Sequence, residues 1–389
     1  MIRIVDVEVE PLSVPLREPF VIASGRIDAT RAVLVRVVLQ HERTNDRGAG
    51  LGEAAALPPV TSCDQPELLA TLTAAAHALR GVSFSGSRGL RDVVDGVAGD
   101  CGLHLVARAG LESALLFAWA ELLCVPMHRL LGSDPSDDPL RRARARPGRV
   151  PFDVETDITI PIAEPSHMAA QVCRWRAQGF RIFKLKVGRN DDDGGSEGDV
   201  AAIDAIAIAA PGVRLRLDGN AGQTEEQARA LFHRALEQGL TVELLEQPTP
   251  ASSSSASSAS SVATLARLSA SLPIPVIADE SAGTYADALA LAAAGVSGLN
   301  LKLVKHGGPT EAARIGRLAR RRRLALMAGA MVETRVGLSA MLHVVRALGA
   351  GPVAIDLDTA FLLADDPFVG GYASNGPRLT LLDGGPARR

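Results

Sequence analysis

Aromatic residues and paired cysteines are scarce in this 389-residue chain. Phe, Tyr and Trp make up 3% of the residues although 47% are hydrophobic, so we expect a globular core of Ala, Leu and Val. The four cysteines, Cys63, Cys101, Cys124 and Cys173, are scattered without a CxxC pair. This pattern is typical of reduced, buried thiols and predicts a cytoplasmic protein.

Strong charge and long apolar segments are missing as well. The net charge is −3, which argues against a basic surface for nucleic acid. The N-terminal segment carries Asp6, Glu8 and Glu10 where a leader would have apolar residues, and no long uncharged apolar run follows. We therefore expect no signal peptide, no membrane span, and no membrane or nucleic-acid partner.

The first third of the chain has the pattern of an α+β domain over residues 1–132. Alternating apolar positions predict two strands and helical spacing predicts two helices, in the order Ile2–Val14, Ala32–Leu39, Glu67–Leu79 and Leu105–Leu123. Loops are expected over 19–26, which carries an apolar patch, and over 50–64. Residues 133–150, rich in Asp, Pro and Arg, are predicted to form a surface linker with solvated arginines.

From Asp157 onward, predicted strands and helices alternate regularly. The expected strands are Asp157–Ile160, Ile182–Val187, Arg214–Asp218, Val242–Glu246, Pro275–Ala278, Gly298–Leu303, Leu324–Ala328 and Val353–Leu357. The expected helices are Ser166–Gln178, Asp199–Ala209, Glu225–Gln238, Val262–Ala270, Tyr285–Ala294, Thr310–Arg322 and Leu338–Leu348. Because the repeat has the size of a βα unit and the strands are largely apolar, the pattern favours a closed parallel barrel. An open doubly wound sheet is the alternative, but no Gly-rich dinucleotide turn follows the first strand.

Two segments interrupt this alternation. Residues 189–198 contain the run Asp191–Asp193 and are predicted to form a solvated loop. Residues 252–261 are almost pure Ser and Ala, which predicts a flexible insertion without chemistry of its own.

Two lysines alternate with bulky apolar residues in the segment Phe183–Val187. In a strand, residues two apart share a face, so Lys184 and Lys186 point the same way. Two like charges inside a sheet repel each other and are desolvated, which costs stability unless carboxylates face them. We therefore predict that this strand is catalytic.

Carboxylates and a further lysine occupy the ends of the other predicted strands, at Asp218, Glu246, Asp279, Lys302, Asp356 and Asp358. In a parallel barrel, chemistry collects at the carboxyl ends of the strands. Taken singly, each residue has a structural explanation, because an Asp at a strand end commonly forms a turn or caps a helix. Taken together, Asp218, Glu246 and Asp279 lie on successive strands and supply hard oxygen ligands spaced for Mg²⁺.

This arrangement suits removal of the α-proton from a carboxylate substrate. Losing that proton adds a second negative charge, and a divalent ion on the carboxylate oxygens stabilises the resulting enediolate. A lysine base must be neutral, and nearby cations and burial lower its pKa. Two lysines on opposite faces of the α-carbon would let one abstract the proton and the other return it with inversion. Lys184 would hold the substrate carboxylate and tune Lys186.

As a set, these motifs resemble the muconate lactonizing enzyme subgroup of the enolase superfamily. The order is Lys-x-Lys, Asp-x-Asn, Glu-Gln-Pro, Asp-Glu-Ser and Asn-x-Lys, and the similarity extends over Leu51–Ala54, Pro126–Gly132 and Asn300–Gly308. The resemblance implies an α/β fold in which a modified TIM barrel, (β/α)7β, over residues 151–360 lies beneath the N-terminal α+β capping domain. Residues 361–389 would pack back on the cap.

The same resemblance implies the roles of the central residues. Asp218, Glu246 and Asp279 would bind one Mg²⁺ per subunit, and Lys186 and Lys302 would be the acid/base pair. Lys302 is preferred to Lys305 because strand alternation places it with Asn300, whereas Lys305 has the opposite parity. By analogy with related barrels, a homo-oligomer is expected.

Within the subgroup, the chain is most similar to dipeptide epimerases such as L-Ala-D/L-Glu epimerase. The segments Glu155–Thr159, Gly329–Gly337 and Asp356–Asp358 carry this similarity. It implies that Asp356 and Asp358 receive the free ammonium group of a dipeptide and that Thr159 contacts the substrate near the first barrel strand. The implied activity is Mg²⁺-dependent epimerisation of a dipeptide carboxylate at the α-carbon of its C-terminal residue.

One position departs from this pattern. Epimerases that act on an acidic C-terminal residue tend to carry a basic residue in the first capping loop, where this chain has Gly25 followed by Arg26. Arg26 is therefore the expected substrate contact, and an apolar C-terminal residue is the alternative.

Other reactions fit the residues less well. The substrates of o-succinylbenzoate synthase, muconate cycloisomerase and N-acylamino acid racemase lack an ammonium group, which leaves Asp356 and Asp358 without a partner. A metal-free Schiff-base aldolase using Lys186 or Lys302 would leave the three metal-spaced carboxylates without a role.

Overall fold

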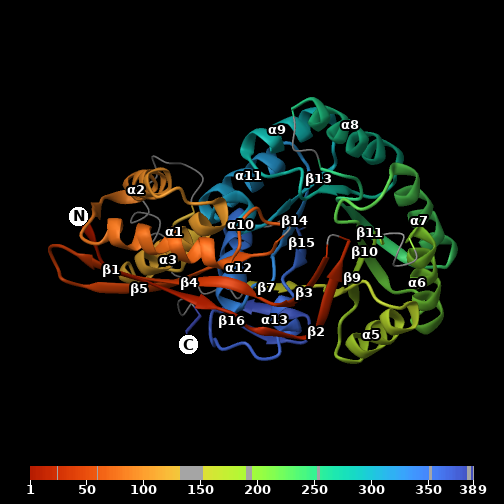
Figure 1. Ribbon diagram of the computed structural model, residues 1–389, viewed down its shortest axis with the longest axis horizontal. Coiled ribbons are helices and arrows are strands. Elements are labelled where there is room, and N and C mark those ends of the chain that lie inside the picture. The colour runs from red at the N-terminus through yellow and green to blue at the C-terminus, as the bar shows by residue number, and fades with distance from the viewer. Residues whose placement is uncertain are drawn as a thin grey trace.

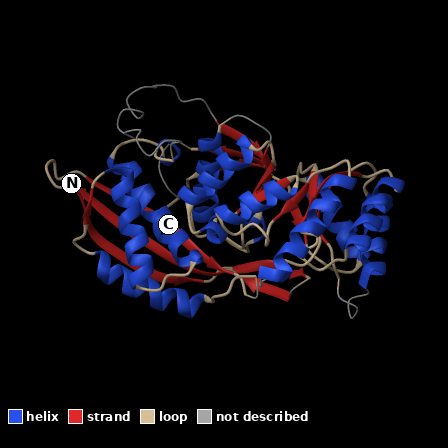
Figure 2. Cartoon of the chain, turned by 90° about the horizontal axis from the view of Figure 1, so that it is seen from above, coloured by secondary structure: helices blue, strands red, loops and turns tan. Residues whose placement is uncertain are grey.

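The computed structural model describes residues 1–23, 25–58, 60–131, 152–189, 195–251, 255–349, 353–382 and 387–388. An N-terminal α+β cap and a barrel lie side by side along the long axis of the molecule (Figures 1 and 2). The predicted linker over 133–150 falls outside the described residues, as do 190–194 and 252–254 within the two predicted insertions. The division into cap, linker, barrel and tail at the predicted boundaries stays a proposal.

The cap is an antiparallel sheet with helices against it. Its strands are β1 (Ile2–Leu12), β4 (Arg31–His41), β5 (Arg47–Ala56) and the short β6 (Ser83–Phe84), in the order β5-β4-β1-β6. The helices are α1 (Gln65–Leu79), α2 (Gly86–Asp100) and α3 (Leu105–Leu122), and the short 3₁₀ helix η1 (Met127–Arg129) follows. The paired strands β1 and β4 confirm the first two predicted strands.

Helix α2 was not predicted, because it contains four glycines, which lower helix propensity. Its apolar residues Leu90, Val94 and Val97 nevertheless recur at helical spacing and are buried. Tertiary packing of this apolar stripe therefore outweighs the weak local preference.

The prediction of a loop beginning at Gly50 is wrong, because this segment belongs to strand β5, paired along its length with β4. Its glycines serve close packing against helix α3. A Cβ atom on Gly50 or Gly52 would overlap the backbone of α3 at Ala114 and Gly110, respectively. Alternation of Gly with Ala and Leu therefore marks a strand that a helix approaches closely, not a turn.

The prediction of a loop over 19–26 is also wrong. Strands β2 (Pro15–Ile22) and β3 (Gly25–Ala29) form an antiparallel hairpin in which Phe20 faces Ile27. The hairpin extends from the cap to the barrel (Figure 1), where the backbone N–H of Ile162 donates a 2.9 Å hydrogen bond to the carbonyl of Val21. The uninterrupted apolar run 20–23 hides the strand alternation in the sequence.

The barrel consists of eight parallel strands in sequential order. They are β8 (Ile158–Ile160), β9 (Ile182–Lys186), β10 (Arg214–Asp218), β11 (Thr241–Glu246), β12 (Val276–Ala278), β13 (Gly298–Leu301), β14 (Ala325–Gly329) and β15 (Val353–Asp356). A parallel bridge between Thr156 and Ile355 brings the last strand against the start of the first. The predicted α/β fold, a modified TIM barrel with an N-terminal capping domain, is therefore confirmed.

Helices surround the barrel at nearly the predicted positions. They are α5 (Pro165–Ala177), α6 (Gly195–Ala209), α7 (Glu225–Glu237), α8 (Ser255–Ser271), α9 (Tyr285–Ala294), α11 (Pro309–Arg321) and α12 (Arg335–Leu348), with the short α10 (Leu303–His306) after β13. The prediction of a flexible Ser-rich segment is corrected from Ser255 onward, where α8 begins. Interspersed alanines favour helix enough to extend it into the Ser-rich run.

The chain beyond the barrel contacts both the barrel and the cap. Helix α13 (Thr359–Leu362) follows β15, and strands β16 (Tyr372–Asn375) and β17 (Arg378–Leu381) form a small sheet with β7 (Phe152–Glu155). A bridge joins Leu363 to Leu16 of the hairpin. Among the described residues, no helix combines the length and apolar character needed to span a bilayer.

Replacing Gly52 by Ala is expected to destabilise the protein by about 3 kcal/mol, because the new methyl group would overlap the carbonyl of Gly110. Gly96→Ala is the matched control. A Cβ atom at this position meets nothing within 4 Å, and the substitution removes a glycine from helix α2. The control should stabilise the protein by about 0.5–1 kcal/mol. Urea unfolding of both variants measures the two effects, and equal stabilities would contradict the packing argument.

Candidate active site at the barrel mouth

The predicted catalytic and metal-binding residues converge at the carboxyl ends of the barrel strands. Lys184 and Lys186 lie on β9, Asp218 ends β10, Glu246 ends β11, Asp279 follows β12, Lys302 follows β13, and Asp356 ends β15 with Asp358 two residues later. Each of these side chains is less than a tenth exposed. Alternation along the strands directs them into the barrel, as the sequence pattern predicts.

Lys184 is the centre of the cluster. Its Nζ atom lies 2.9 Å from Asp218 Oδ2, 2.8 Å from Glu246 Oε2 and 2.7 Å from Asp356 Oδ2. Burial acts against a charged Lys184, but the three carboxylates outweigh it and raise the pKa of the ammonium group well above its usual range. Lys184 is therefore a cation held by three carboxylates.

The other two lysines stand on opposite sides of the mouth. Lys186 Nζ lies 2.6 Å from Asp218 Oδ2, and Lys302 Nζ lies 2.7 Å from Asp279 Oδ2. Strands β9 and β13 are separated by β10, β11 and β12 in the barrel. The two ammonium groups thus flank the three carboxylates that these intervening strands deliver.

Lys305 also reaches this cluster. Strand alternation does not extend to it, because the chain turns into α10 directly after Lys302. Its Nζ atom lies 2.6 Å from Asp279 Oδ1 and donates to the carbonyls of Asp279 and Asn300. Lys305 therefore fixes the orientation of Asp279, a structural role in keeping with its opposite parity in the sequence.

Gln247 clamps the ends of β11 and β12 together. Its Oε1 accepts hydrogen bonds from the backbone N–H groups of Asp279 and Ser281 at 3.0 and 3.1 Å, and its Nε2 donates to Thr249 and Ser281. The backbone φ of Gln247 is 27°, a value that a residue other than glycine adopts only when its surroundings enforce it. Gln247 thus positions Glu246 and Asp279, and the Glu-Gln-Pro motif is the signal that points to it.

Asp218, Glu246 and Asp279 fit a divalent cation by their chemistry. They form an all-oxygen donor set on neighbouring strands. Burial and the charge of Asp218 raise the pKa of Glu246 to about 7, and Glu246 Oε2 receives no aligned hydrogen bond although Lys184 lies nearby. The cluster therefore has a carboxylate that additional positive charge would stabilise. In this structure the lysines separate the three carboxylates, which do not converge as closely as the group described next.

A second carboxylate cluster lies on the other side of Lys184. Oxygen atoms of Asp157, Asp356 and Asp358 all lie within 4.8 Å of one another. Arg216 Nη1 pairs with Asp157 Oδ2 at 2.7 Å, whereas Asp157 Oδ1 is buried without a hydrogen bond. The backbone N–H of Thr159 donates to Asp358 Oδ2 at 2.5 Å. These carboxylates are suited to bind a cation, and Asp157 was missed although it shares the parity of Thr159.

Arg26 is not part of either cluster. It is exposed on β3 and forms an ion pair of 3.0 Å with Asp28, because the buried Ile27 between them directs both to solvent. Phe20 of the same hairpin lies nearer the mouth, with its ring centroid 6.0 Å from Lys186 Nζ. The predicted contact of Arg26 with substrate therefore has no support in this geometry.

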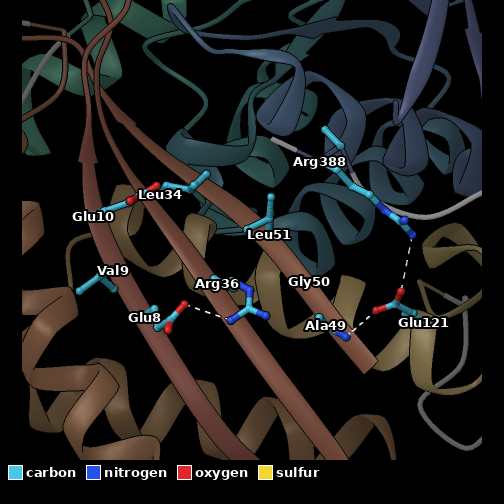
Figure 3. Close-up of a pocket in the computed structure, with 11 residues that line it drawn as sticks. Glu8, Val9, Glu10, Leu34, Arg36, Ala49, Gly50, Leu51, Glu121 and Arg388 are labelled. Atoms are coloured by element: carbon cyan, nitrogen blue, oxygen red, sulfur yellow. Dashed lines mark hydrogen bonds and ion pairs between the residues drawn. The ribbon is translucent and has the colours of Figure 1, made fainter. Parts of the chain in front are cut away.

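A cavity of about 690 Å³ lies away from the barrel mouth, on the cap sheet (Figure 3). Two pairs of its charged groups bond with each other, Glu8 with Arg36 and Glu121 with Arg388. None of the predicted site residues lines it. We assign the chemistry to the barrel mouth.

Comparison with known proteins finds similar sequences over nearly the whole chain. The family model described as "Enolase C-terminal domain-like" matches residues 167–386. The chain is 32% identical to the aromatic dipeptide epimerase of Herpetosiphon aurantiacus over 97% of this chain and 96% of that protein. It is 29% identical to the L-Ala-D/L-Glu epimerase of Bacillus subtilis over 97% and 94% of the two chains.

A solved structure of the Enterococcus faecalis dipeptide epimerase, complexed with Mg and the dipeptide L-Leu-L-Tyr, has a similar fold. It superposes with a TM-score of 0.81 at 26% identity and covers 100% of both chains.

The raised pKa of Asp358 predicts how the stability of the protein depends on pH. Burial and Asp356 raise this pKa from the ordinary 3.8 to about 7. Because the folded-state pKa exceeds the unfolded one, ionising Asp358 costs folding free energy as the pH rises from about 4 to about 7. Asp358→Asn should therefore stabilise the protein at pH 8 by about 1–3 kcal/mol and leave it nearly unchanged at pH 4. Urea unfolding at both values measures this; a variant less stable than wild type at pH 8 would contradict the argument.

Proposed function

The chain belongs to the enolase superfamily, and on this premise we propose that it is a Mg²⁺-dependent isomerase that epimerises a dipeptide at the α-carbon of its C-terminal residue. The observation that carries the proposal is the placement of Lys186 and Lys302 on opposite sides of the barrel mouth, with three carboxylates between them. Epimerisation requires a proton to leave one face of a carbon and to arrive at the other, and two lysines placed in this way supply both faces.

Lys186 and Lys302 each hold or move a proton at Nζ. One neutral amine accepts the α-proton of the substrate, and the opposing ammonium group donates a proton to the other face. In the reverse direction the roles exchange, so that either epimer serves as substrate. Asp218 and Asp279, which bond the two lysines at 2.6 and 2.7 Å, fix the direction of the ammonium groups.

Asp218, Glu246 and Asp279 are the residues that would hold one Mg²⁺ per subunit. When bound, the ion supplies positive charge that offsets the negative charge developing on the substrate carboxylate. Lys184, which the surrounding acids keep protonated, holds the same carboxylate from the opposite side. Both interactions strengthen as negative charge develops on the substrate carboxylate during loss of the α-proton. Stronger binding of the transition state than of the ground state is the requirement for catalysis.

Asp356 and Asp358 would bind the free ammonium group of the dipeptide, next to Thr159. The burial of these carboxylates beside Asp157 makes an additional cation favourable there. The reactions of o-succinylbenzoate synthase and muconate cycloisomerase, and racemisation of N-acylamino acids, would leave this cluster unused. A Schiff-base aldolase would leave Glu246 and Asp279 unused. The acids at both ends of the mouth therefore favour a dipeptide carboxylate with a free amine.

A homo-oligomer in the cytoplasm completes the proposal. Its support is analogy with related barrels for the assembly and, for the compartment, the free state of all four cysteines.

Metal removal is expected to abolish turnover. Treatment with EDTA should stop α-deuterium incorporation into L-Ala-L-Ala in D₂O, and added Mg²⁺ should restore it, because the three carboxylates otherwise leave the substrate's developing charge uncompensated. Mass spectrometry of the recovered dipeptide measures the exchange. Full exchange in metal-free buffer would exclude the proposed mechanism.

Replacement of one lysine should separate exchange from epimerisation. Lys302→Ala is expected to lower the rate of epimerisation by at least about 1,000-fold, while α-deuterium still enters the one epimer whose proton faces Lys186. Lys186→Ala should show exchange of the opposite epimer only. Arg36→Ala, an exposed change on the cap sheet, is the matched control. If either lysine variant still interconverts the epimers at the wild-type rate, that lysine is not an acid/base group.

A further inference from the structure

A cavity of about 390 Å³ adjoins the ammonium-binding end of the site. It lies among the hairpin, strand β8 and helices α5 and α13, and the residues of its wall that matter here are Phe20, Thr159, Pro161, Trp175, Ala360 and Phe361. Nothing in the proposed chemistry uses this space.

Three parts of the cavity wall adjoin residues of the site. Thr159 forms part of its wall and donates its backbone N–H to Asp358 Oδ2, one of the two proposed ammonium acceptors. Ala360 and Phe361 lie on α13, two and three residues after its N-cap Asp358, and form another part of the wall. Phe20 lines the cavity and also lies over Lys186 at 6.0 Å. The space therefore begins where the amine end of a substrate would lie.

Three aromatic rings, those of Phe20, Trp175 and Phe361, line this cavity alongside apolar and polar side chains. The ring of Phe180 packs edge-on against both Trp175 and Phe361, with centroids 5.4 Å apart in each pair, which fixes the two aromatic walls. The acid at the edge of the cavity, Glu18, is already engaged by Arg174 at 2.7 Å and by Gln171 at 2.8 Å. The carboxylate of Glu18 is thus not free to receive a cationic side chain.

We propose that this cavity receives the side chain of the substrate's N-terminal residue and that the enzyme prefers dipeptides whose N-terminal residue is aromatic or a long aliphatic one. The inference rests on the proposed epimerase function. The ammonium group and the side chain of the N-terminal residue are attached to the same carbon atom. An ammonium group held at Asp358 therefore brings that side chain to the wall formed by Ala360 and Phe361. Burial of an apolar side chain against these rings supplies binding energy far from the reacting carbon.

A substrate series with a constant reaction centre tests the preference. The dipeptides L-Xaa-L-Ala with Xaa Ala, Leu, Phe, Glu and Lys are incubated with the Mg²⁺-loaded enzyme in D₂O, and the rate of α-deuterium entry at the C-terminal alanine gives kcat/KM. We expect L-Phe-L-Ala and L-Leu-L-Ala to exceed L-Ala-L-Ala by about tenfold. Equal values, or a preference for Glu or Lys, would overturn the inference. Failure of every dipeptide to exchange would instead overturn the proposed function.

Filling the cavity tests its location. Ala360→Phe places a ring in the space, so the ratio of kcat/KM for L-Phe-L-Ala to that for L-Ala-L-Ala should fall at least about fivefold. Ala360→Leu, a smaller change, should lower the same ratio less and remains informative if the larger variant does not fold. Ala74→Phe, on the exposed side of α1, is the matched control and should leave the ratio unchanged. An unchanged ratio in both Ala360 variants would show that the side chain binds elsewhere.

Discussion

The arrangement of the barrel mouth depends on one buried ammonium group, that of Lys184, shared by Asp218, Glu246 and Asp356. A buried charge is tolerated only where opposite charge compensates its lost hydration. Because the three carboxylates come from β10, β11 and β15, this single cation ties strands from both sides of β9. Three carboxylates surround the single ammonium group of Lys184. This excess of acids around Lys184 is negative charge that a metal ion and a substrate ammonium group can balance.

Lys184 also divides the mouth into two regions of different chemistry. On one side, Asp218, Glu246 and Asp279 meet the lysines that flank them, which suits proton transfer at a carbon next to a carboxylate. On the other side, Asp356 and Asp358 lie beside Asp157, whose partner Arg216 is itself buried. A substrate with a carboxylate at one end and an ammonium group at the other matches both regions at once. In the proposed reaction, the two charged ends of such a substrate would place its reacting carbon between Lys186 and Lys302.

The barrel and its central residues could be predicted from the sequence because both follow regular repeats along the chain. Apolar strands repeat with the length of a βα unit, and lysines and acids two apart in a strand must share a face. Other features depend on contacts between distant segments. Asp157 becomes part of the site only through its neighbours on β15, Lys305 only because α10 turns it toward Asp279, and the glycines of β5 only because α3 packs on them. The hairpin was missed for the same reason, since the strand character of residues 15–29 depends on pairing between β2 and β3.

The cap contributes to the site because it is locked to the barrel. Glu53 of β5 is buried and accepts hydrogen bonds from the backbone N–H groups of Thr334 and Gly337 and from the Thr334 hydroxyl, at the N-terminus of α12. A carboxylate at a helix N-terminus is favoured by the helix dipole, and burial strengthens that interaction. The hairpin that carries Phe20 belongs to the same cap, so its position over Lys186 is fixed relative to the barrel. The lysines proposed to transfer protons thus belong to the barrel alone, whereas the proposed side-chain cavity combines residues of both parts. Under this proposal, a change in the cap would alter side-chain preference without disturbing the lysines and acids.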